Sequence, residues 1–178
     1  MTAHVDTFVR DNLPPRDQWP DLLFELPELR FPERYNSSAI LDAAIERGFG
    51  ARPALFFTSS TYSYDDMMRD ACRIAHVLKH DFGLLPGNRV LIHASNTRFS
   101  ISAWWGVFRA GGVAVGTMPM LRAQELGIII DKAQVSHAIV DPHLAAEVAQ
   151  AQRAAPVLKH IARTDELAQR MANAPAFV

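Results

Sequence analysis

The sequence predicts an α/β fold, with a parallel β-sheet and crossover helices on both of its faces. Three short apolar runs rich in β-branched residues, at 90–92, 113–115 and 137–140, have the length of buried strands. Between them, apolar residues recur at three- and four-residue spacing over 99–110 and 123–132, which predicts helices. Strands that alternate with helices in this way form parallel sheets, and their crossovers are right-handed.

The first 36 residues predict a proline-rich extended arm. Five prolines, at positions 14, 15, 20, 27 and 32, exclude a long helix and favour extended segments and turns. Seven large apolar side chains are interleaved with them between Trp19 and Phe31. We expect these side chains to hold the arm across the rest of the chain; the alternative is an arm that binds a partner. Residues 37–178 are expected to form one α/β subdomain.

The stretch after the arm predicts a helix followed by a hairpin. A helix is expected over 39–47, with Ser37 or Ser38 as its N-cap and an end at the glycine that follows. Two short segments, 55–58 and 61–63, flank a Ser-Ser turn and are rich in residues that favour strands. They predict a pair of strands.

A long amphipathic helix is expected over 65–82. Ser63 supplies its cap, acidic residues fill its first turn, and Gly83 ends it. His76 and His80 are four residues apart on this helix, a spacing that suits a metal ion. No third ligand accompanies them, so surface histidines are the preferred interpretation.

Beyond the third apolar run, the chain predicts a helix, a strand and a second helix. The first helix is rich in alanine and glutamine and is interrupted by Pro156. A strand is expected over 157–162. A short helix over 164–173 follows, with Thr164 as its cap and Glu166 in its first turn.

Length and composition fit one domain or one large subdomain. The chain has 178 residues, of which 49% are hydrophobic and 21% charged, so it can bury a core. The formal net charge of −1 argues against a surface for nucleic acid or for an anionic membrane. No apolar stretch approaches the roughly 20 residues that span a bilayer. The single cysteine, Cys72, fits a cytoplasmic setting, and a structural role is expected because no histidine base is placed to activate it.

Several motifs resemble the front part of the adenylate-forming enzymes, the acyl-CoA synthetase superfamily. The similar segments are PGNRV at 86–90, SN at 95–96 and FRAGGVAV at 108–115. Within the superfamily the chain is most similar to aryl-CoA ligases of the benzoate and 2-aminobenzoate type, in DNLPP at 11–15, PERYN at 32–36 and TMPMLRAQEL at 117–126. The resemblance implies the N-terminal subdomain of an adenylate-forming enzyme.

The resemblance also implies a function for the whole enzyme. Such an enzyme joins a carboxylate to AMP with ATP and Mg, and then transfers the acyl group to CoA; the subgroup favours an aromatic acid. The superfamily holds ATP with a Ser/Thr/Gly-rich loop followed by Pro and Lys, and neither this loop nor the C-terminal catalytic lysine occurs in this sequence. We therefore expect the N-terminal part of a longer ligase, inactive by itself. The alternatives are a stand-alone α/β module that binds a nucleotide or CoA, and a truncated interaction or oligomerisation domain.

The loop after the second strand is the candidate site within this chain. It follows the carboxyl end of a predicted parallel strand, where open α/β sheets place ligands. By resemblance to CoA-forming relatives, Thr117, Met118 and Pro119 are expected to line the channel for the CoA thiol. Arg122 is placed to meet a CoA phosphate, because a guanidinium suits bidentate contacts with anions. The alternative for Arg122 is a solvated charge at a helix start. No catalytic or metal-binding residue is assigned.

A fragment of a larger enzyme has surfaces that once met the missing part. Such a surface is an exposed apolar patch or an unpaired strand edge, and both promote association. We therefore expect self-association in solution. The other expected partners are a small carboxylate and CoA, with neither nucleic acid nor a membrane among them.

Overall fold

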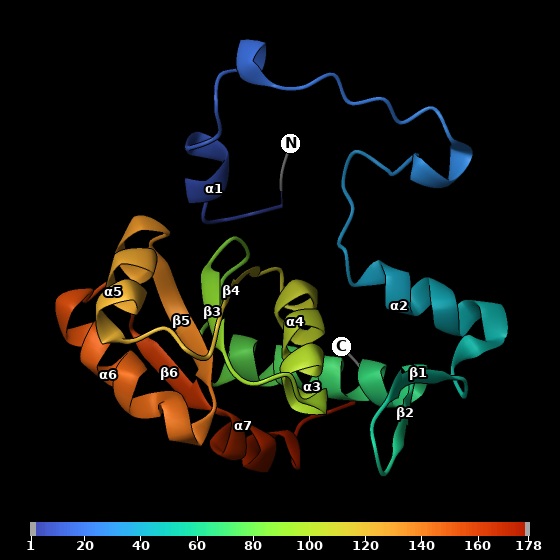
Figure 1. The fold of residues 1–178 in the computed structure, drawn as a ribbon. Helices are drawn as coiled ribbons and strands as arrows, with labels where there is room; N and C mark the ends of the chain where they lie inside the picture. Colours follow the sequence, from blue (N-terminus) through green and yellow to red (C-terminus); the bar gives the residue numbers. More distant parts are fainter. Residues whose placement is uncertain (1–2, 177–178) are drawn as a thin grey trace.

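Four parallel strands form the central sheet, in the order β4–β3–β5–β6 (Figure 1). The computed structural model describes residues 3–176 of the chain. The strands are β3 (Arg89–His93), β4 (Val113–Thr117), β5 (Val135–Val140) and β6 (His160–Arg163). The first three confirm the expected strands, and β6 begins three residues later than predicted.

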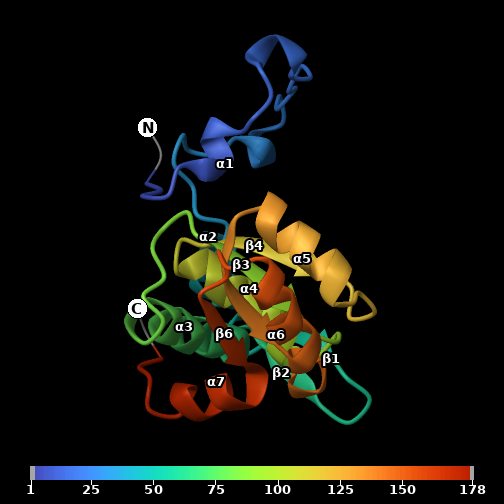
Figure 2. The same cartoon turned by 90° about the vertical axis from the view of Figure 1, so that its left-hand side faces the viewer.

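Helices cover both faces of this sheet, which confirms the predicted fold class (Figures 1 and 2). One face carries α3 (Tyr64–His80), α4 (Arg98–Arg109) and α7 (Thr164–Met171), and the other carries α5 (Ala123–Lys132) and α6 (Ala145–Ala154). Side chains of the inner strand β3 alternate between the two cores, because successive residues of a strand face opposite sides. Val90 and Ile92 join the core with α3 and α4, whereas Leu91 joins the core with α5 and α6.

The chain leaves β3 toward one edge of the sheet and leaves β5 toward the other, so a topological switch point lies between these two strands. After β3 the chain passes through α4 to β4, and after β4 it returns through α5 to β5 on the other side of β3. Open α/β sheets bind ligands at the carboxyl ends of strands beside such a reversal. The loop 94–97 after β3 and the single turn Pro142–Leu144 after β5 lie at this position.

Ser63 caps α3 as predicted, in a complete capping box. Its Oγ accepts a hydrogen bond from Asp66 N at 3.1 Å, and Asp66 Oδ2 accepts one from Ser63 N at 3.1 Å. Gly83, with φ of 66°, follows the end of the helix, as expected for a residue that must be left-handed.

At the other two predicted caps the side chain makes no capping hydrogen bond, although Ser38 does occupy the N-cap position of α2. Ser38 precedes α2 (Ala39–Ala44), but its side chain makes no capping hydrogen bond; Asn36 Oδ1 instead accepts from Ser38 N at 2.9 Å. Thr164 lies inside α7, and its hydroxyl donates to Asp141 Oδ1 at 3.2 Å. At α2 the Asn36 oxygen thus takes the part expected of a serine. At α7 Arg163 occupies the N-cap position, and Asp165 Oδ1 accepts from Glu166 N at 3.0 Å.

The helix and hairpin between the arm and α3 are present. α2 continues as a π-helical turn, Ile45–Phe49, in which Gly48 adopts a left-handed conformation with φ of 80°. β1 (Pro53–Phe56) and β2 (Thr61–Ser63) pair in antiparallel fashion, with β1 two residues earlier than predicted.

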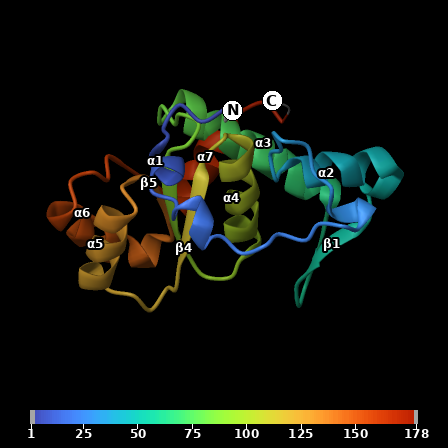
Figure 3. The ribbon, with the colours of Figure 1, turned by 90° about the horizontal axis from the view of Figure 1, so that it is seen from above.

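The arm carries α1 (Phe8–Asp11) and two single turns, Arg16–Gln18 and Pro27–Leu29. Figure 3 shows it passing from α1 across to α2. Every residue from 9 to 37 is exposed to solvent. The expectation that apolar side chains hold the arm across the rest of the chain is therefore wrong for this stretch, because α3 to α7 already cover both faces of the sheet.

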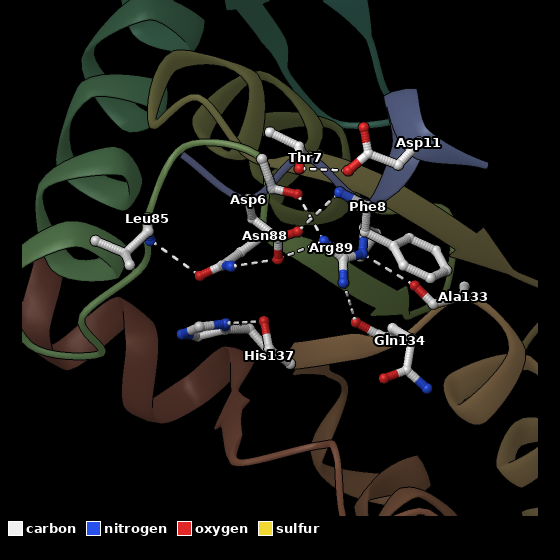
Figure 4. A network of polar contacts seen from close by, with 12 residues as sticks. Asp6, Thr7, Phe8, Asp11, Leu85, Asn88, Arg89, Ala133, Gln134 and His137 are labelled. Carbon is white, nitrogen blue, oxygen red and sulfur yellow. Dashed lines mark hydrogen bonds and ion pairs between the residues drawn. The ribbon is translucent and has the colours of Figure 1, made fainter. Parts of the chain in front are cut away.

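The beginning of the arm is fixed at the amino-terminal end of the sheet (Figure 4). Val5 N and Asp6 N both donate to Pro86 O, at 2.9 and 3.0 Å. The Asp6 carboxylate lies 2.5 Å from a guanidinium nitrogen of Arg89 and accepts from Asn88 Nδ2 at 2.9 Å. Residues far apart in the sequence thus close this end of the domain.

Arg89 is the centre of this network, with a side chain that is only 6% exposed. Its guanidinium also donates to the carbonyl oxygens of Gly87, Ala133 and Gln134, at 2.9, 2.9 and 2.7 Å. The ring of Phe8 lies 4.6 Å from its central carbon. These contacts compensate for the removal of a charged group from water.

Candidate functional site

The carboxyl ends of β3, β4 and β5 bring His93, Thr117 and Asp141 together. In the sheet register His93 pairs with Thr117 on one side and with Val140 on the other. Asp141 is the next residue after β5, and its N–H donates to His93 O at 3.2 Å. These residues lie at the switch point, which makes this edge of the sheet the candidate functional site.

His93 is fully buried, with a relative exposure of 0%. Its Nδ1 lies 3.0 Å from Thr117 Oγ1, and that hydroxyl donates its own hydrogen to Ile92 O at 3.3 Å. The hydroxyl oxygen therefore accepts from the ring, so we assign the hydrogen to Nδ1 and a lone pair to Nε2. Within residues 3–176, Nε2 has no hydrogen-bond partner.

Burial lowers the pKa of His93 from its ordinary value of 6.5, because the charged ring is less stable away from water. Asp141 and Glu147 oppose this effect by favouring the imidazolium, and His143 adds to the lowering. The ring is therefore neutral at pH 7, and Nε2 is a hydrogen-bond acceptor. A group that reaches it must donate an N–H or an O–H.

The carboxylate of Asp141 already has partners. It accepts from Ser95 N at 2.8 Å and from Thr164 Oγ1 at 3.2 Å. These bonds join the loop after β3 to the start of α7, so Asp141 positions the backbone at this edge.

The histidine pair on α3 has no third ligand beside it among the described residues. The rings of His76 and His80 lie 4.3 Å apart, and residues 3–176 contain no group of three or more His, Cys, Asp or Glu side chains suited to a metal ion.

The predicted loop residues lie in two places: Thr117 at the end of β4, and Met118 and Pro119 in the turn that follows. Thr117 meets His93, as described above. Met118 is 70% exposed and Pro119 is half-buried. Met118 O accepts from Leu121 N at 3.1 Å, which closes a turn at the tip of the loop.

Arg122 meets Glu147 of the neighbouring helix α6. Its Nη1 lies 3.6 Å from Glu147 Oε1, and its side chain is 68% exposed. Glu147 Oε2 accepts from Ala123 N at 2.9 Å, and Glu125 Oε2 accepts from Arg122 N at 3.0 Å. Two carboxylates therefore cap α5 where the sequence has no Ser or Thr cap. A phosphate that approaches Arg122 finds an accessible guanidinium but competes with Glu147.

Three residues of this edge were not predicted from the sequence: His93, Asp141 and Glu147. His93 is the last residue of one apolar run and Asp141 follows another, so both occupy the ends of parallel strands. The position at the end of a parallel strand could therefore have identified both residues from the sequence. No comparable sequence signal marks Glu147, because it caps α5 while lying on α6.

A pocket of about 350 Å³ lies between α2, α3 and the end of α4. Its lining includes Cys72 and Met68, together with Asp42 and Arg109, which form an ion pair at 2.9 Å. Cys72 is buried and its Sγ lies 3.7 Å from Met68 Sδ, in keeping with a structural role. The pocket shares no residue with the loop after β4.

Among residues 3–176, every helix is too short or too polar to span a bilayer.

Comparisons with known proteins identify the family to which this architecture belongs. Residues 42–176 match the family model described as AMP-binding enzyme. The long-chain-fatty-acid–CoA ligase of Bacillus subtilis (strain 168) is 31% identical over 109 residues, which are 61% of this chain and 19% of that ligase. The benzoate–CoA ligase of Thauera aromatica is 23% identical over 136 residues, which are 76% of this chain and 26% of that ligase.

Solved structures share the fold. The anthranilate CoA ligase AuaEII in complex with anthranoyl-AMP superposes with a TM-score of 0.76 at 19% identity, over 83% of this chain and 29% of that one. A benzoate CoA ligase from Burkholderia xenovorans LB400 gives 0.71 at 19% identity, over 81% and 29%. The chain thus spans between 19% and 29% of the length of these relatives. Because the family model covers most of the chain, this protein belongs to the AMP-binding enzyme family, as the sequence motifs predicted.

Proposed function

We propose that this chain is the N-terminal part of an ATP-dependent acyl- or aryl-CoA ligase. In the proposed reaction a carboxylate oxygen attacks the α-phosphorus of ATP, which yields an acyl-adenylate and releases pyrophosphate. The CoA thiol then attacks the acyl carbon, which forms the thioester and releases AMP. The observation that carries the proposal is the family match over residues 42–176, combined with the CoA ligases among the relatives.

An aromatic acid is the proposed substrate class. The Thauera benzoate–CoA ligase matches 76% of the chain at 23% identity, whereas the fatty-acid ligase matches 61% at 31% identity. The solved anthranilate and benzoate CoA ligases share the fold over 83% and 81% of the chain. The motifs at 11–15, 32–36 and 117–126 favour the same subgroup. A panel of benzoate, 2-aminobenzoate and a long-chain fatty acid, tested with the whole enzyme, discriminates between these classes.

The chain by itself is proposed to be inactive, with its arm at 1–36 and its subdomain at 37–178 making up only part of the catalytic unit. The sequence has no Ser/Thr/Gly-rich loop followed by Pro and Lys for ATP. Within residues 3–176 no group of three or more His, Cys, Asp or Glu side chains is placed to hold a metal ion. Incubation with benzoate, ATP and Mg is expected to release no pyrophosphate from this chain and to release it from the full-length product of the native gene. Pyrophosphate release by the short chain would contradict the proposal.

Thr117, Met118 and Pro119 are proposed to line the channel for the CoA thiol, with Arg122 at a CoA phosphate. The position of the loop at the carboxyl edge and the accessibility of the guanidinium support this assignment. In the full-length enzyme, Arg122→Gln is expected to raise the KM for CoA about tenfold, the loss of one charge-assisted hydrogen bond. Pyrophosphate exchange from the acid and ATP should stay unchanged, and Arg153→Gln, an exposed arginine on α6, serves as the control.

Self-association is proposed for the isolated chain. Among the described residues, β4 and β6 each have a neighbour on one side only, so both edges of the sheet can pair with another chain. Light scattering over a range of concentrations tests this, and a monomer at high concentration would contradict it.

We also propose a cytoplasmic location for the enzyme, because its proposed co-substrates are ATP and CoA.

A further inference from the structure

His93 links β3 to both of its neighbouring strands at the carboxyl edge of the sheet. Its carbonyl oxygen accepts from the N–H of Asp141, the residue after β5, at 3.2 Å. On the other side, its ring nitrogen Nδ1 lies 3.0 Å from Thr117 Oγ1, at the last paired position of β4. The ladder of paired residues ends there, so this side-chain bond secures β4 at the point where the next loop begins.

The loop that follows Thr117 and leads to α5 has few buried contacts of its own. The side chains of Met118 and Met120 are 70% and 81% exposed. At the far end of the loop, Glu147 Oε2 accepts from Ala123 N at 2.9 Å. A loop without buried side chains takes its course from the elements that fix its ends, and His93 acts on the first of these ends.

The ring of His93 is an unusual choice for the place that it occupies. It is fully buried, with an exposure of 0%, and within residues 3–176 its Nε2 has no hydrogen-bond partner. A buried acceptor without a partner costs free energy, and an apolar side chain of similar size would avoid that cost. Such departures from the ordinary rules of packing concentrate at functional sites. The Nδ1 bond to Thr117 is therefore the contribution by which the polar ring is explained.

We propose that His93 is a positioning residue, which acts through Thr117 to hold the loop 118–122 in the place where it contacts CoA. This inference rests on the proposed function, which assigns Thr117, Met118 and Pro119 to the thiol channel. A loop that is already ordered binds its ligand more tightly, because no conformational entropy is lost when the ligand arrives. His93 takes no part in the chemistry, so the formation of the acyl-adenylate should not depend on it.

Two substitutions separate the hydrogen bond from the bulk of the ring. His93→Asn places an amide nitrogen at the position of Nδ1, so the donor to Thr117 Oγ1 is kept while the outer part of the ring is lost. His93→Leu keeps an apolar side chain of comparable bulk and has no donor. Leu167→Ala, in the core beneath α7, is a control that lowers stability at a distance from the loop. Urea unfolding should show a loss of stability in all three variants.

Amide exchange in the 178-residue chain measures the order of the loop without any reference to activity. In His93→Leu, exchange at 120–122 should become about tenfold faster, because the loop loses one of its supports. In His93→Asn and in Leu167→Ala, exchange at these positions should stay within about twofold of the parent chain.

Kinetics of the full-length product of the native gene test the role toward CoA. His93→Leu should raise the KM for CoA about tenfold, which corresponds to the loss of one hydrogen bond. Pyrophosphate exchange from benzoate and ATP should change by less than about twofold, because that step does not use CoA. His93→Asn should restore the KM for CoA, whereas a ring that serves only the stability of the fold would lower both activities together.

Each other result counts against the proposal in a distinct way. Equal effects of the two His93 substitutions on exchange and KM, or a larger effect of His93→Asn, would assign the role to the bulk of the ring and overturn the proposal. Faster exchange with an unchanged KM for CoA, in an enzyme that forms the thioester, overturns the role toward CoA and leaves the ligase function intact. A full-length protein that releases no pyrophosphate overturns the proposed function and, with it, the role toward CoA.

Discussion

His93 and Thr117 join β3 to β4 through a side-chain hydrogen bond of 3.0 Å at the carboxyl edge of the sheet. The bond lies where the backbone ladder ends, since these two residues are the last paired positions of their strands. It therefore fixes the point at which the loop 118–122 leaves the sheet.

Thr117→Val should destabilise the chain measurably. The change keeps the shape of the side chain and removes the hydroxyl, so the buried Nδ1–H of His93 loses its acceptor. The expected loss in the free energy of unfolding is about 1–3 kcal/mol, the cost of an unsatisfied buried donor. Urea unfolding measures it. Thr61→Val, at an exposed position on β2, should change stability by less than about 0.5 kcal/mol, and an equal effect at both positions would refute the argument.

Glu147→Ala should weaken the start of α5, although Glu147 lies on α6. The change leaves Ala123 N without its side-chain acceptor and removes a negative charge from the positive end of a helix. The expected loss is about 1 kcal/mol, as for other N-cap deletions. Amide exchange should quicken at 123–126 in particular. Glu46→Ala, an exposed glutamate on the turn after α2, is the control and should leave that exchange unchanged.

Regular elements were predictable because their signals are local. The apolar spacing that defines α3 and α4 lies within a few turns of sequence, and the Ser63–Asp66 capping box spans four residues. Alternation between apolar runs and helical spacing was sufficient for a parallel sheet with helices on both faces. The glycine ends, Gly48 and Gly83, followed from backbone sterics alone.

Contacts between distant elements were not predictable from these signals. Glu147 caps a helix that begins 24 residues earlier, and Asp141 holds Ser95 N across 46 residues. The lone pair of His93 is notable only once burial is known. For the arm, apolar content was read as a sign of burial, and the structure exposes it. The apolar composition of the arm indicates that its side chains favour contact with another surface, but composition does not indicate where that surface lies.

Asp6→Asn should release the beginning of the arm. The neutral amide ends the ion pair and leaves the buried Arg89 with its three carbonyl contacts. The expected loss in the free energy of unfolding is about 1–3 kcal/mol, less than for a buried charge with no remaining partner. Protease cutting near Phe8 should also become faster. Asp17→Asn, an exposed residue of the arm, should alter neither quantity.

The contribution of Asp6 should depend on pH. Burial raises its pKa, but hydrogen bonds from Arg89, Phe8 N and Asn88 outweigh this, so the pKa lies below its ordinary 3.8. A carboxyl group with a lowered folded-state pKa stabilises fully above its unfolded value and loses that effect as the pH falls through the folded value. The stability difference between the parent chain and Asp6→Asn should be constant from pH 5 to 8 and shrink below 3.8. A difference unchanged at pH 3 would show that charge has no part in it.

Two buried histidines should make the chain less stable at mildly acidic pH. Burial lowers the pKa of His137 from 6.5; its contact with Phe82 O opposes this, and the stacked His160 ring, 4.8 Å away, adds to it. The pKa of His93 is lowered as well. Because the unfolded chain binds protons more readily than the folded one, the free energy of unfolding should be greatest above pH 6.5 and fall as the pH drops below it.

His137→Gln separates this effect from general acid unfolding. Glutamine can still donate to Phe82 O, which accepts from His137 Nε2 at 3.0 Å, but it does not titrate. The slope of stability against pH between 5 and 7 should therefore become shallower, with the slope due to His93 remaining. His80→Gln, at an exposed position on α3, serves as the control. Urea unfolding at half-unit pH steps measures these slopes, and an equal change in both variants would exclude burial of His137 as the cause.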